Sequence, residues 1–165
     1  MYKNIIIDSC PIIFLSKINT LDILPELFPG EIRTIKKVKD ELNRGFVPAD
    51  ELIVMNNFLK KIEVVNTNES LISSSTLSRT DKELITHAIN NKYDLLVTDD
   101  NLLRRISQHE NIKTIGTLGL LIQYAKKGIR SIEAVHGYID VLIKKHKLRI
   151  SVELYSEIIK TLNEI

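Results

Sequence analysis

Three aspartates stand where two apolar stretches of the chain end, and their positions raise a question about charge. Asp8 closes the run "IIID", while Asp99 and Asp100 close "LLVTDD" at residues 95–100. Adjacent carboxylates repel one another and raise each other's pKa. Two interpretations are open: a solvated turn, which Asp favours, or a cation that several carboxylates bind together.

The segments around these aspartates predict an α/β fold with a parallel sheet. Short runs rich in Ile and Val predict strands at 3–8, 32–35, 62–65, 94–98 and 112–116. Helical patterns lie at 11–19, 36–44, 49–61, 81–91, 101–109, 118–127, 131–146 and 151–164. Continuous apolar character is typical of strands that helices cover on both faces. We therefore expect one domain over residues 1–165, with right-handed crossovers and a helical extension from about residue 117.

In a parallel sheet the carboxyl ends of the strands lie at one edge, where ligands bind. If the first and fourth strands are neighbours, Asp8, Asp99 and Asp100 meet at that edge. Hard oxygen donors without a matching Cys or His favour Mg²⁺ or Mn²⁺. A carboxylate cluster that holds one or two such ions is suited to phosphodiester hydrolysis.

Two helical acids complete the candidate set. Asp81 lies in the first turn of the helix before the fourth strand, where a negative charge is also favourable for the helix alone. The pattern "TDKE" there predicts a capping box in which Thr80 caps the helix and Glu83 reaches back to the Thr80 amide. Glu41 lies on the helix after the second strand, and its alternative role is a solvated helix charge. Asp40 is its natural control, since adjacent helical residues point about 100° apart.

The charges are divided unevenly along the chain. Residues 1–100 hold 12 Lys and Arg against 15 Asp and Glu, a net charge of −3. Residues 101–149 hold 10 against 3, a net charge of +7. An acidic part beside a basic part suits a polyanionic substrate held next to a metal, and solvated helix faces remain the alternative.

Composition limits the class of protein. The chain of 165 residues is 44% apolar, and no apolar run is long enough to span a membrane. The first residues do not resemble a secretory signal, and a single cysteine excludes an internal disulfide, so we expect a cytoplasmic protein. Cys10 is expected to be a small core residue. The Ser-rich stretch 70–76 is expected to form a short helix or a loop.

Four motifs together resemble the PIN-domain ribonucleases, a family that includes VapC-like toxins. The stretch "IIIDSCPIIFLSKI" (5–18) resembles the opening strand and helix of the family, and "VKDEL" (38–42) its second motif. The stretches "TDKELITHA" (80–88) and "LLVTDD" (95–100) resemble the third and fourth motifs of the family. The tail, "TIGTLGLLIQYAKKGI" (114–129) and "LRISVELYSEIIKTLNE" (148–164), is similar to a PIN subfamily with extended C-terminal helices.

The resemblance implies a three-layer α/β/α domain with strand order 3-2-1-4-5 and a metal-dependent endoribonuclease. It places the Mg²⁺ or Mn²⁺ ligands and catalytic acids at Asp8, Glu41, Asp81, Asp99 and Asp100. Activated water would leave a 5′-phosphate and a 3′-hydroxyl on the RNA. Supporting roles fall to Ser9 and Thr98, and contacts with RNA phosphates to Arg104 and Arg105. As partners it implies a homodimer and, for the toxin branch, an antitoxin that blocks the acidic cleft.

Two other classes of protein are consistent with parts of this pattern. One is a PIN relative that binds nucleic acid with little or no catalysis, in a regulatory or defence role. The other is a receiver-like signalling domain, which also gathers acids around Mg²⁺ at strand ends. A receiver would need an Asp after its third strand and a Lys after its fifth, whereas this chain has "VVNTN" and "TIGT" there.

Overall fold

The five predicted strands form a single parallel sheet in a computed structural model of the chain, which describes residues 2–44, 47–68, 72 and 76–165. The strands are β1 (Asn4–Ile7), β2 (Glu31–Ile35), β3 (Glu63–Val65), β4 (Leu95–Val97) and β5 (Lys113–Ile115). Their order is β3-β2-β1-β4-β5, and every neighbouring pair is parallel. The predicted α/β fold and strand order are confirmed.

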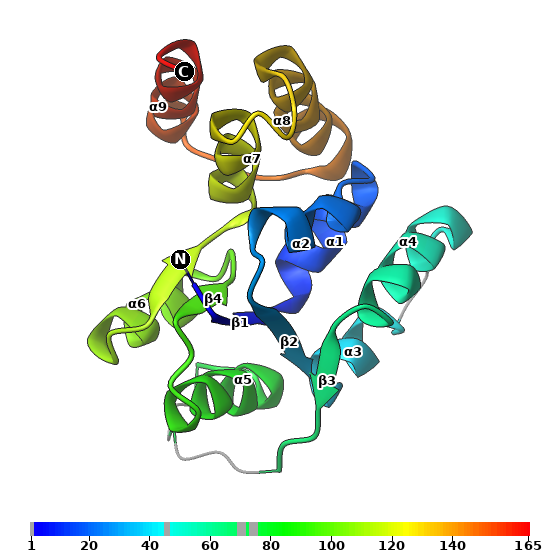
Figure 1. Cartoon of the computed structure of the whole chain (residues 1–165), viewed down its shortest axis with the longest axis vertical. Coiled ribbons are helices and arrows are strands. Elements are labelled where there is room, and N and C mark those ends of the chain that lie inside the picture. Colours follow the sequence, from blue (N-terminus) through cyan, green and yellow to red (C-terminus); the bar gives the residue numbers. More distant parts are fainter. Residues whose placement is uncertain (1, 45–46, 69–71, 73–75) are drawn as a thin grey trace.

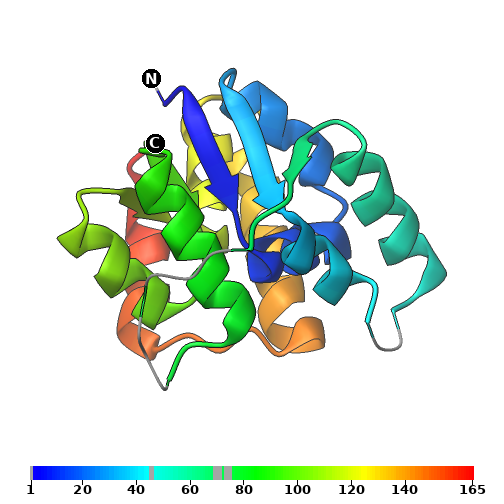
Figure 2. The ribbon, with the colours of Figure 1, turned by 90° about the horizontal axis from the view of Figure 1, so that it is seen from below.

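Helices cover the sheet on both faces (Figure 1). On one face α1 (Ser9–Lys17) packs against α4 (Ala49–Leu59), and on the other α5 (Arg79–Asn90) packs against α6 (Asn101–His109). The short helices α2 (Leu24–Leu27) and α3 (Lys36–Leu42) flank β2. Figure 2 shows β1 and β2 side by side, running in the same direction.

The central strands are buried because helices lie on both sides of them. Ile5, Ile6 and Ile7 of β1 are fully buried, and the β4 residues Leu95–Val97 are at most 1% exposed. β4 is apolar throughout and β1 is apolar after Asn4, as burial on two faces requires. The sheet is thereby a rigid platform whose β1 and β4 ends, paired at Ile7 and Val97, present the next residues at the same edge.

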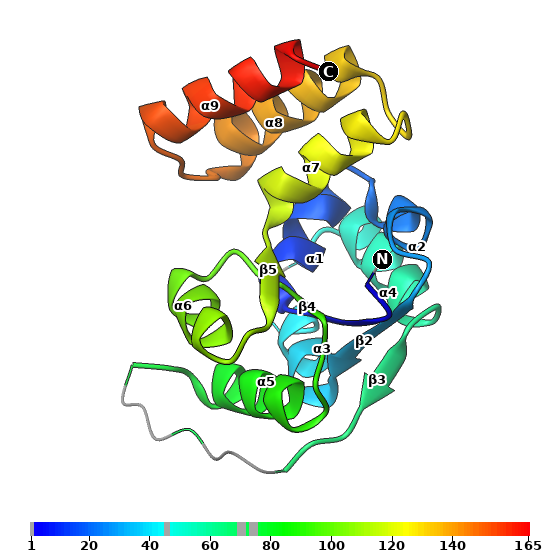
Figure 3. The ribbon, with the colours of Figure 1, turned by 60° about the vertical axis from the view of Figure 1, so that its left-hand side comes forward.

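The C-terminal part forms three helices, α7 (Thr117–Lys126), α8 (Ile132–His146) and α9 (Val152–Asn163). They stack together beyond α1 (Figure 3), and their buried side chains belong to the same hydrophobic cluster as the sheet. α9 is the least covered, since Val152 is 77% and Leu154 is 42% exposed. Across the described residues, no helix is both long and apolar enough to cross a membrane.

Several local predictions differ from the structure. The first helix begins at Ser9 rather than residue 11, because the Asp8 carboxylate caps it by accepting a hydrogen bond from the Ser9 amide. The sequence did not predict the 3₁₀ turn Leu21–Ile23 or the four-residue α2 that follows it. Most of the stretch 70–76 lies outside the described residues.

The predicted capping box of α5 is wrong by two residues. Ser78 is the N-cap, and its hydroxyl accepts from the Asp81 amide at 3.1 Å. The Asp81 carboxylate accepts from the Ser78 amide at 3.2 Å, so the box is Ser78 with Asp81. Thr80 already lies within the helix, and the buried Glu83 contacts other partners.

Candidate active site

Asp8 and the segment Thr98–Asp100 lie together at the carboxyl edge of the sheet. The Asp8 amide donates to the Val97 carbonyl at 2.9 Å, which continues the β1–β4 pairing by one residue. The Thr98 amide donates to the Ile115 carbonyl at 2.9 Å, which links the end of β4 to β5. The predicted convergence of the first and fourth strand ends is therefore present in the backbone.

Asp8 is held in a fixed orientation by three donors. Its Oδ1 accepts from the Ser9 amide at 2.6 Å and the Ser9 hydroxyl at 3.3 Å, and its Oδ2 accepts from the Thr98 hydroxyl at 2.9 Å. Only 4% of Asp8 is exposed. The pKa of Asp8 is raised to about 6, mainly by burial and to a smaller extent by the negative charge of Asp81. The hydrogen bonds from Thr98 and Ser9 oppose this rise.

Thr98 connects the two aspartate-bearing strand ends. Its hydroxyl donates to Asp8 and accepts from the Asp100 amide at 3.1 Å. The side chain is fully buried, so both contacts are shielded from water. The supporting role predicted for Thr98 has a clear geometric basis, since one hydroxyl fixes the spacing between Asp8 and the start of α6.

Asp99 and Asp100 point to different helices. Asp100 caps α6, with Oδ1 accepting from the amides of Leu102 at 2.7 Å and Leu103 at 2.8 Å. Asp99 accepts from the amide of Thr117 at 2.8 Å and from its hydroxyl at 2.5 Å, so it caps α7. The sequence predicts that one of the pair faces the metal and that the other faces solvent or caps the helix near Asn101, and Asp100 is that cap. Asp99 as the closer metal ligand stays a prediction.

Arg104 of α6 contacts both the backbone after β4 and the Asp99 side chain. Its Nε donates to the Thr98 carbonyl at 3.1 Å, and its Nη2 lies 4.0 Å from the Asp99 carboxylate. A Cβ at Gly116 would lie 2.0 Å from that Nη2 and 2.5 Å from Asp99 Oδ1, so a larger residue there would have to displace both side chains. Arg105 is exposed and has no ion pair within the part of the chain that the structure describes. Phosphate contacts by either arginine stay a prediction.

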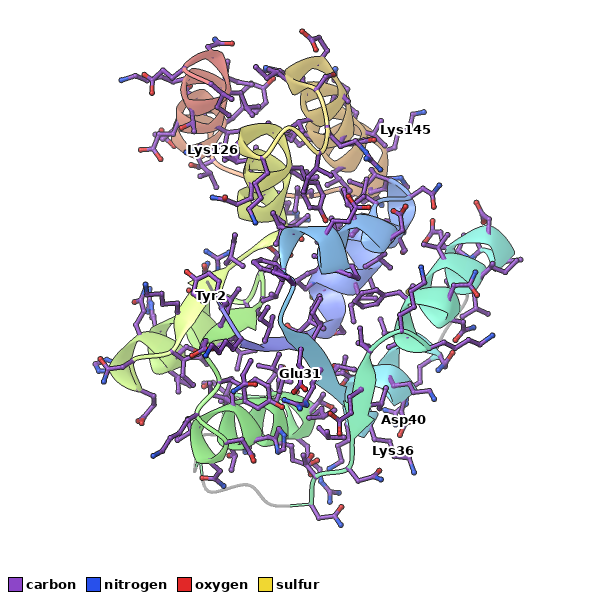
Figure 4. All side chains as sticks on the ribbon, viewed as in Figure 1. Tyr2, Glu31, Lys36, Asp40, Lys126 and Lys145 are labelled. Atoms are coloured by element: carbon purple, nitrogen blue, oxygen red, sulfur yellow. The ribbon has the colours of Figure 1, made fainter. Side chains whose placement is uncertain are left out.

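Glu41 and Asp40 differ as adjacent helical residues should. α3 buries Val38 and Leu42, and the half-buried Glu41 lies next to that face. Asp40 is exposed, and Figure 4 shows it together with Lys36 at the outer surface of the molecule. The Glu41 carboxylate makes no hydrogen bond or ion pair with the described residues, which leaves its oxygens available.

Glu83 is a buried acid for which the sequence predicted only a capping role. It is 2% exposed, pairs with Lys37 of α3, and accepts from the Thr67 hydroxyl at 3.2 Å. The Arg79 guanidinium lies 3.7 Å from its carboxylate. The pair joins the helix that carries Glu41 to the helix that carries Asp81. Its helical spacing from Thr80 and Leu84, both buried, was the available signal that Glu83 faces inward.

Cys10 is not the core residue that was expected. It is exposed, because the first turn of α1 lies beside the carboxylates rather than under the sheet. Partial desolvation is the main cause that raises the pKa of its thiol to about 12, and the negative charges of Asp8, Asp99, Asp100 and Asp81 contribute the remainder. Four of the five predicted acids therefore lie within electrostatic range of this thiol.

The carboxylates at this edge imply a metal ion, and their donor atoms are of the type that such an ion binds. The donors are hard carboxylate oxygens, and the raised pKa of Asp8 marks negative charge that a cation would neutralise. Among the described residues, however, no group of three or more His, Cys, Asp or Glu side chains is close enough together to hold a metal. The carboxylates supply the donor type and charge, and they are turned toward helix N-termini rather than one shared centre.

Comparison with known families supplies the deciding observation. The family model DUF3368: PIN domain matches residues 4–164. The chain belongs to the PIN-domain family. The predicted family is therefore confirmed, and membership of it suggests a nuclease-type function.

Two further comparisons complete the picture of relatives of this PIN-domain chain. No curated protein matches its sequence significantly. One similar solved structure is a PilT N-terminus domain protein, SSO1118, from the hyperthermophilic archaeon Sulfolobus solfataricus P2. It has 12% sequence identity and a TM-score of 0.48, over 68% of this chain and 86% of that one.

Proposed function

We propose that this PIN-domain protein is a metal-dependent endoribonuclease. The observation that carries the proposal is that Asp8 and the pair Asp99–Asp100 follow the neighbouring ends of β1 and β4 at the carboxyl edge of the sheet, where the Thr98 hydroxyl bonds to both Asp8 and the Asp100 amide. The charge of Asp81 also acts on Asp8. Ligands of open parallel sheets bind at this edge. A buried acid with a pKa of about 6 among other acids is typical of a functional site rather than of a structural one.

The proposed ligands of Mg²⁺ or Mn²⁺ are the four aspartates together with Glu41, whose oxygens have no other partner among the described residues. When bound, such an ion activates water and stabilises the leaving oxygen, which yields a 5′-phosphate and a 3′-hydroxyl. Ser9 and Thr98 hold both oxygens of Asp8 in place. Lys37 and Glu83 hold the helices of Glu41 and Asp81 together.

The proposed substrate is RNA, which would meet basic side chains beside the acidic edge. Residues 101–149 carry the net charge of +7, and most of their cations are exposed. Arg105 lies one turn into α6, directly beyond Asp100, where a phosphate could reach it. The toxin role, the homodimer, an antitoxin that covers the acidic cleft and a cytoplasmic location belong to this proposal as implications of the family resemblance.

A second function, nucleic-acid binding without catalysis, has an observation in its favour. The described residues include no metal-holding group of three, and Asp99 and Asp100 already cap two helices. A PIN relative whose acids only stabilise the fold would have its carboxylates bonded to helix N-termini in the same way.

The two functions are separated by incubating end-labelled single-stranded RNA with the protein, in Mn²⁺, in Mg²⁺ and in EDTA. Cleavage that needs the metal and is lost in Asp8→Asn supports the nuclease. RNA binding without cleavage in either metal supports the second function. A protein that neither binds nor cleaves RNA contradicts both.

A further inference from the structure

A cavity of about 600 Å³ opens beside Asp99 and reaches under the C-terminal helices. Its floor is the end of β5 and the start of α7, and its opposite wall is the segment Leu148–Ser151 with the first turns of α9. Pockets of this size, about 300–1,000 Å³, hold small organic ligands. The cavity therefore extends the acidic edge toward the basic part of the chain.

The walls of the cavity are apolar on two facing helices. Leu118 and Ile122 of α7 line one side, and Leu154 and Ile158 of α9 line the other. Leu154 is 42% exposed although it is apolar, because nothing in the described chain covers it at the cavity mouth. These aliphatic side chains come from two helices that pack against each other, and together they line one cavity, here called the slot. Their apolar surface suits a flat ring, since base recognition commonly places a base between apolar side chains.

The polar groups of the cavity lie at its two ends. Asp99 lies at the end near the acidic edge, together with Arg104. Arg149 and Ser151 lie on the C-terminal wall, and Ser151 is the N-cap of α9, whose N-terminus carries partial positive charge. Arg149 is exposed and has no ion pair among the residues that the structure describes. A cation and a helix N-terminus beside apolar walls complement a phosphate joined to a base.

We infer that this cavity binds one nucleotide of the RNA strand, next to the phosphate held at the acidic edge, with its base between α7 and α9 and its phosphate on Arg149. This inference rests on the proposed function and adds the subsite that positions the strand. RNA is recognised through bases splayed out of single strands, which a slot of this kind can hold. The C-terminal extension then contributes directly to substrate binding.

The test measures binding apart from cleavage, by fluorescence anisotropy of a fluorescein-labelled RNA hexamer with full-length Asp8→Asn protein in Mg²⁺. In that background, Arg149→Ala removes the cation and Leu154→Trp fills the slot. Each should weaken binding about fivefold or more, and Arg149→Ala alone should lower the slope of log K against log salt by about 0.7.

Matched controls lie outside the cavity, one on α8 shortly before Arg149 and one on α9 beside Leu154. Lys145 of α8 is an exposed cation at the outer surface (Figure 4), and Val152 of α9 is more exposed than Leu154. Lys145→Ala and Val152→Trp should change the dissociation constant less than about twofold. Equal weakening by the cavity variants and their controls would overturn the inference.

A second measurement needs no cavity variant, in case Leu154→Trp disturbs folding. A hexamer with one 4-thiouridine is cross-linked to the Asp8→Asn protein and digested with trypsin. Adducts on peptides 114–126 and 150–160, which carry the two walls, support the subsite. Adducts confined to other peptides, or uridine monophosphate binding as tightly as the hexamer, would overturn an RNA subsite.

Failure of this inference is distinguishable from failure of the proposed function. If the parent protein cleaves RNA while both cavity variants bind as well as their background, the subsite is wrong and the nuclease stands. If both variants lose binding and the parent never cleaves, the cavity binds RNA and the nuclease is wrong.

Discussion

At the carboxyl ends of β1 and β4, carboxylates are held by backbone amides and hydroxyls, whereas the cations that follow α8 extend into solvent. Asp8, Asp99 and Asp100 each accept two or more hydrogen bonds. Lys147 and Arg149 are exposed and unpaired within the described chain. Fixed acids suit chemistry that requires precise geometry, and free cations suit attraction of a flexible polyanion. The proposed roles of the two regions follow from this difference in rigidity.

The largest expected effect comes from removing an acid that has no structural partner. Glu41→Gln should lower RNA cleavage about 1,000-fold, because a neutral amide neither binds the metal well nor accepts a proton. Asp40→Asn is the control, since Asp40 is exposed on the adjacent helical position. Rates are measured with end-labelled RNA in Mn²⁺. Equal losses in the two variants would show that α3 presents a different face to the site.

Asp8→Asn tests whether the buried Asp8 carboxylate lowers the stability of the folded chain. Folding raises the pKa of Asp8 from 3.8 to about 6, so the folded state prefers the protonated form. The contribution of protonated Asp8 to stability is then greatest below pH 4 and is lost as pH rises through 6. Without metal, Asp8→Asn should be more stable than the parent by about 3 kcal/mol at pH 7.

The measurement for Asp8 is urea unfolding in EDTA across pH 3.5–7.5. Because Asn is also a good N-cap, α1 keeps its cap in the variant. The gain should shrink toward zero near pH 4. A variant less stable than the parent at pH 7 would show that the hydrogen bonds from Ser9 and Thr98 outweigh burial.

Asp99 and Asp100 allow two neighbouring carboxylates to be compared as metal ligands. If only one of them contacts the metal, one of Asp99→Asn and Asp100→Asn should lower cleavage about 100-fold and the other about threefold. Mn²⁺ affinity by calorimetry should fall in parallel with cleavage. Two mild losses would remove this pair from the active site and leave both residues as helix caps.

Lys37→Met tests the connection between α3 and α5. Removal of the cation leaves Glu83 buried and charged, which should cost about 2 kcal/mol of stability. Lys36→Met is the matched control, because Lys36 is exposed on the outer side of the same helix turn (Figure 4). Both are compared by urea unfolding at pH 7. Identical stabilities would mean that Thr67 and Arg79 suffice to hold Glu83.

The smallest expected effect is stabilisation by the metal. Mn²⁺ at ten times its dissociation constant should add about 1.4 kcal/mol to the stability, since it binds only the folded chain. Thermal melts of the parent should rise with Mn²⁺, and those of Asp8→Asn should rise less. An unchanged melting temperature at millimolar Mn²⁺ would argue strongly against a metal at this edge.

The sequence predicted the strands because continuous apolar runs and alternation with helices depend on local pattern, whereas the strand order came from the resemblance to the PIN-domain family. With that order, Asp8 and Asp99–Asp100 end neighbouring strands. Contacts made across the fold were beyond it, such as the cap that Asp99 provides to Thr117. Two overlapping patterns, "SRTD" and "TDKE", both resemble capping boxes, and only the backbone shows that Ser78 begins α5.

The close fit of Gly116 beneath Asp99 and Arg104 has a consequence for how relatives of this chain diverge. A Cβ at 116 would lie too close to both the Arg104 guanidinium and the Asp99 carboxylate. A relative with a larger residue at 116 therefore needs both side chains to be moved or replaced. Positions 99, 104 and 116 should therefore change together during evolution, and a lineage that keeps the glycine after losing the arginine would break that coupling.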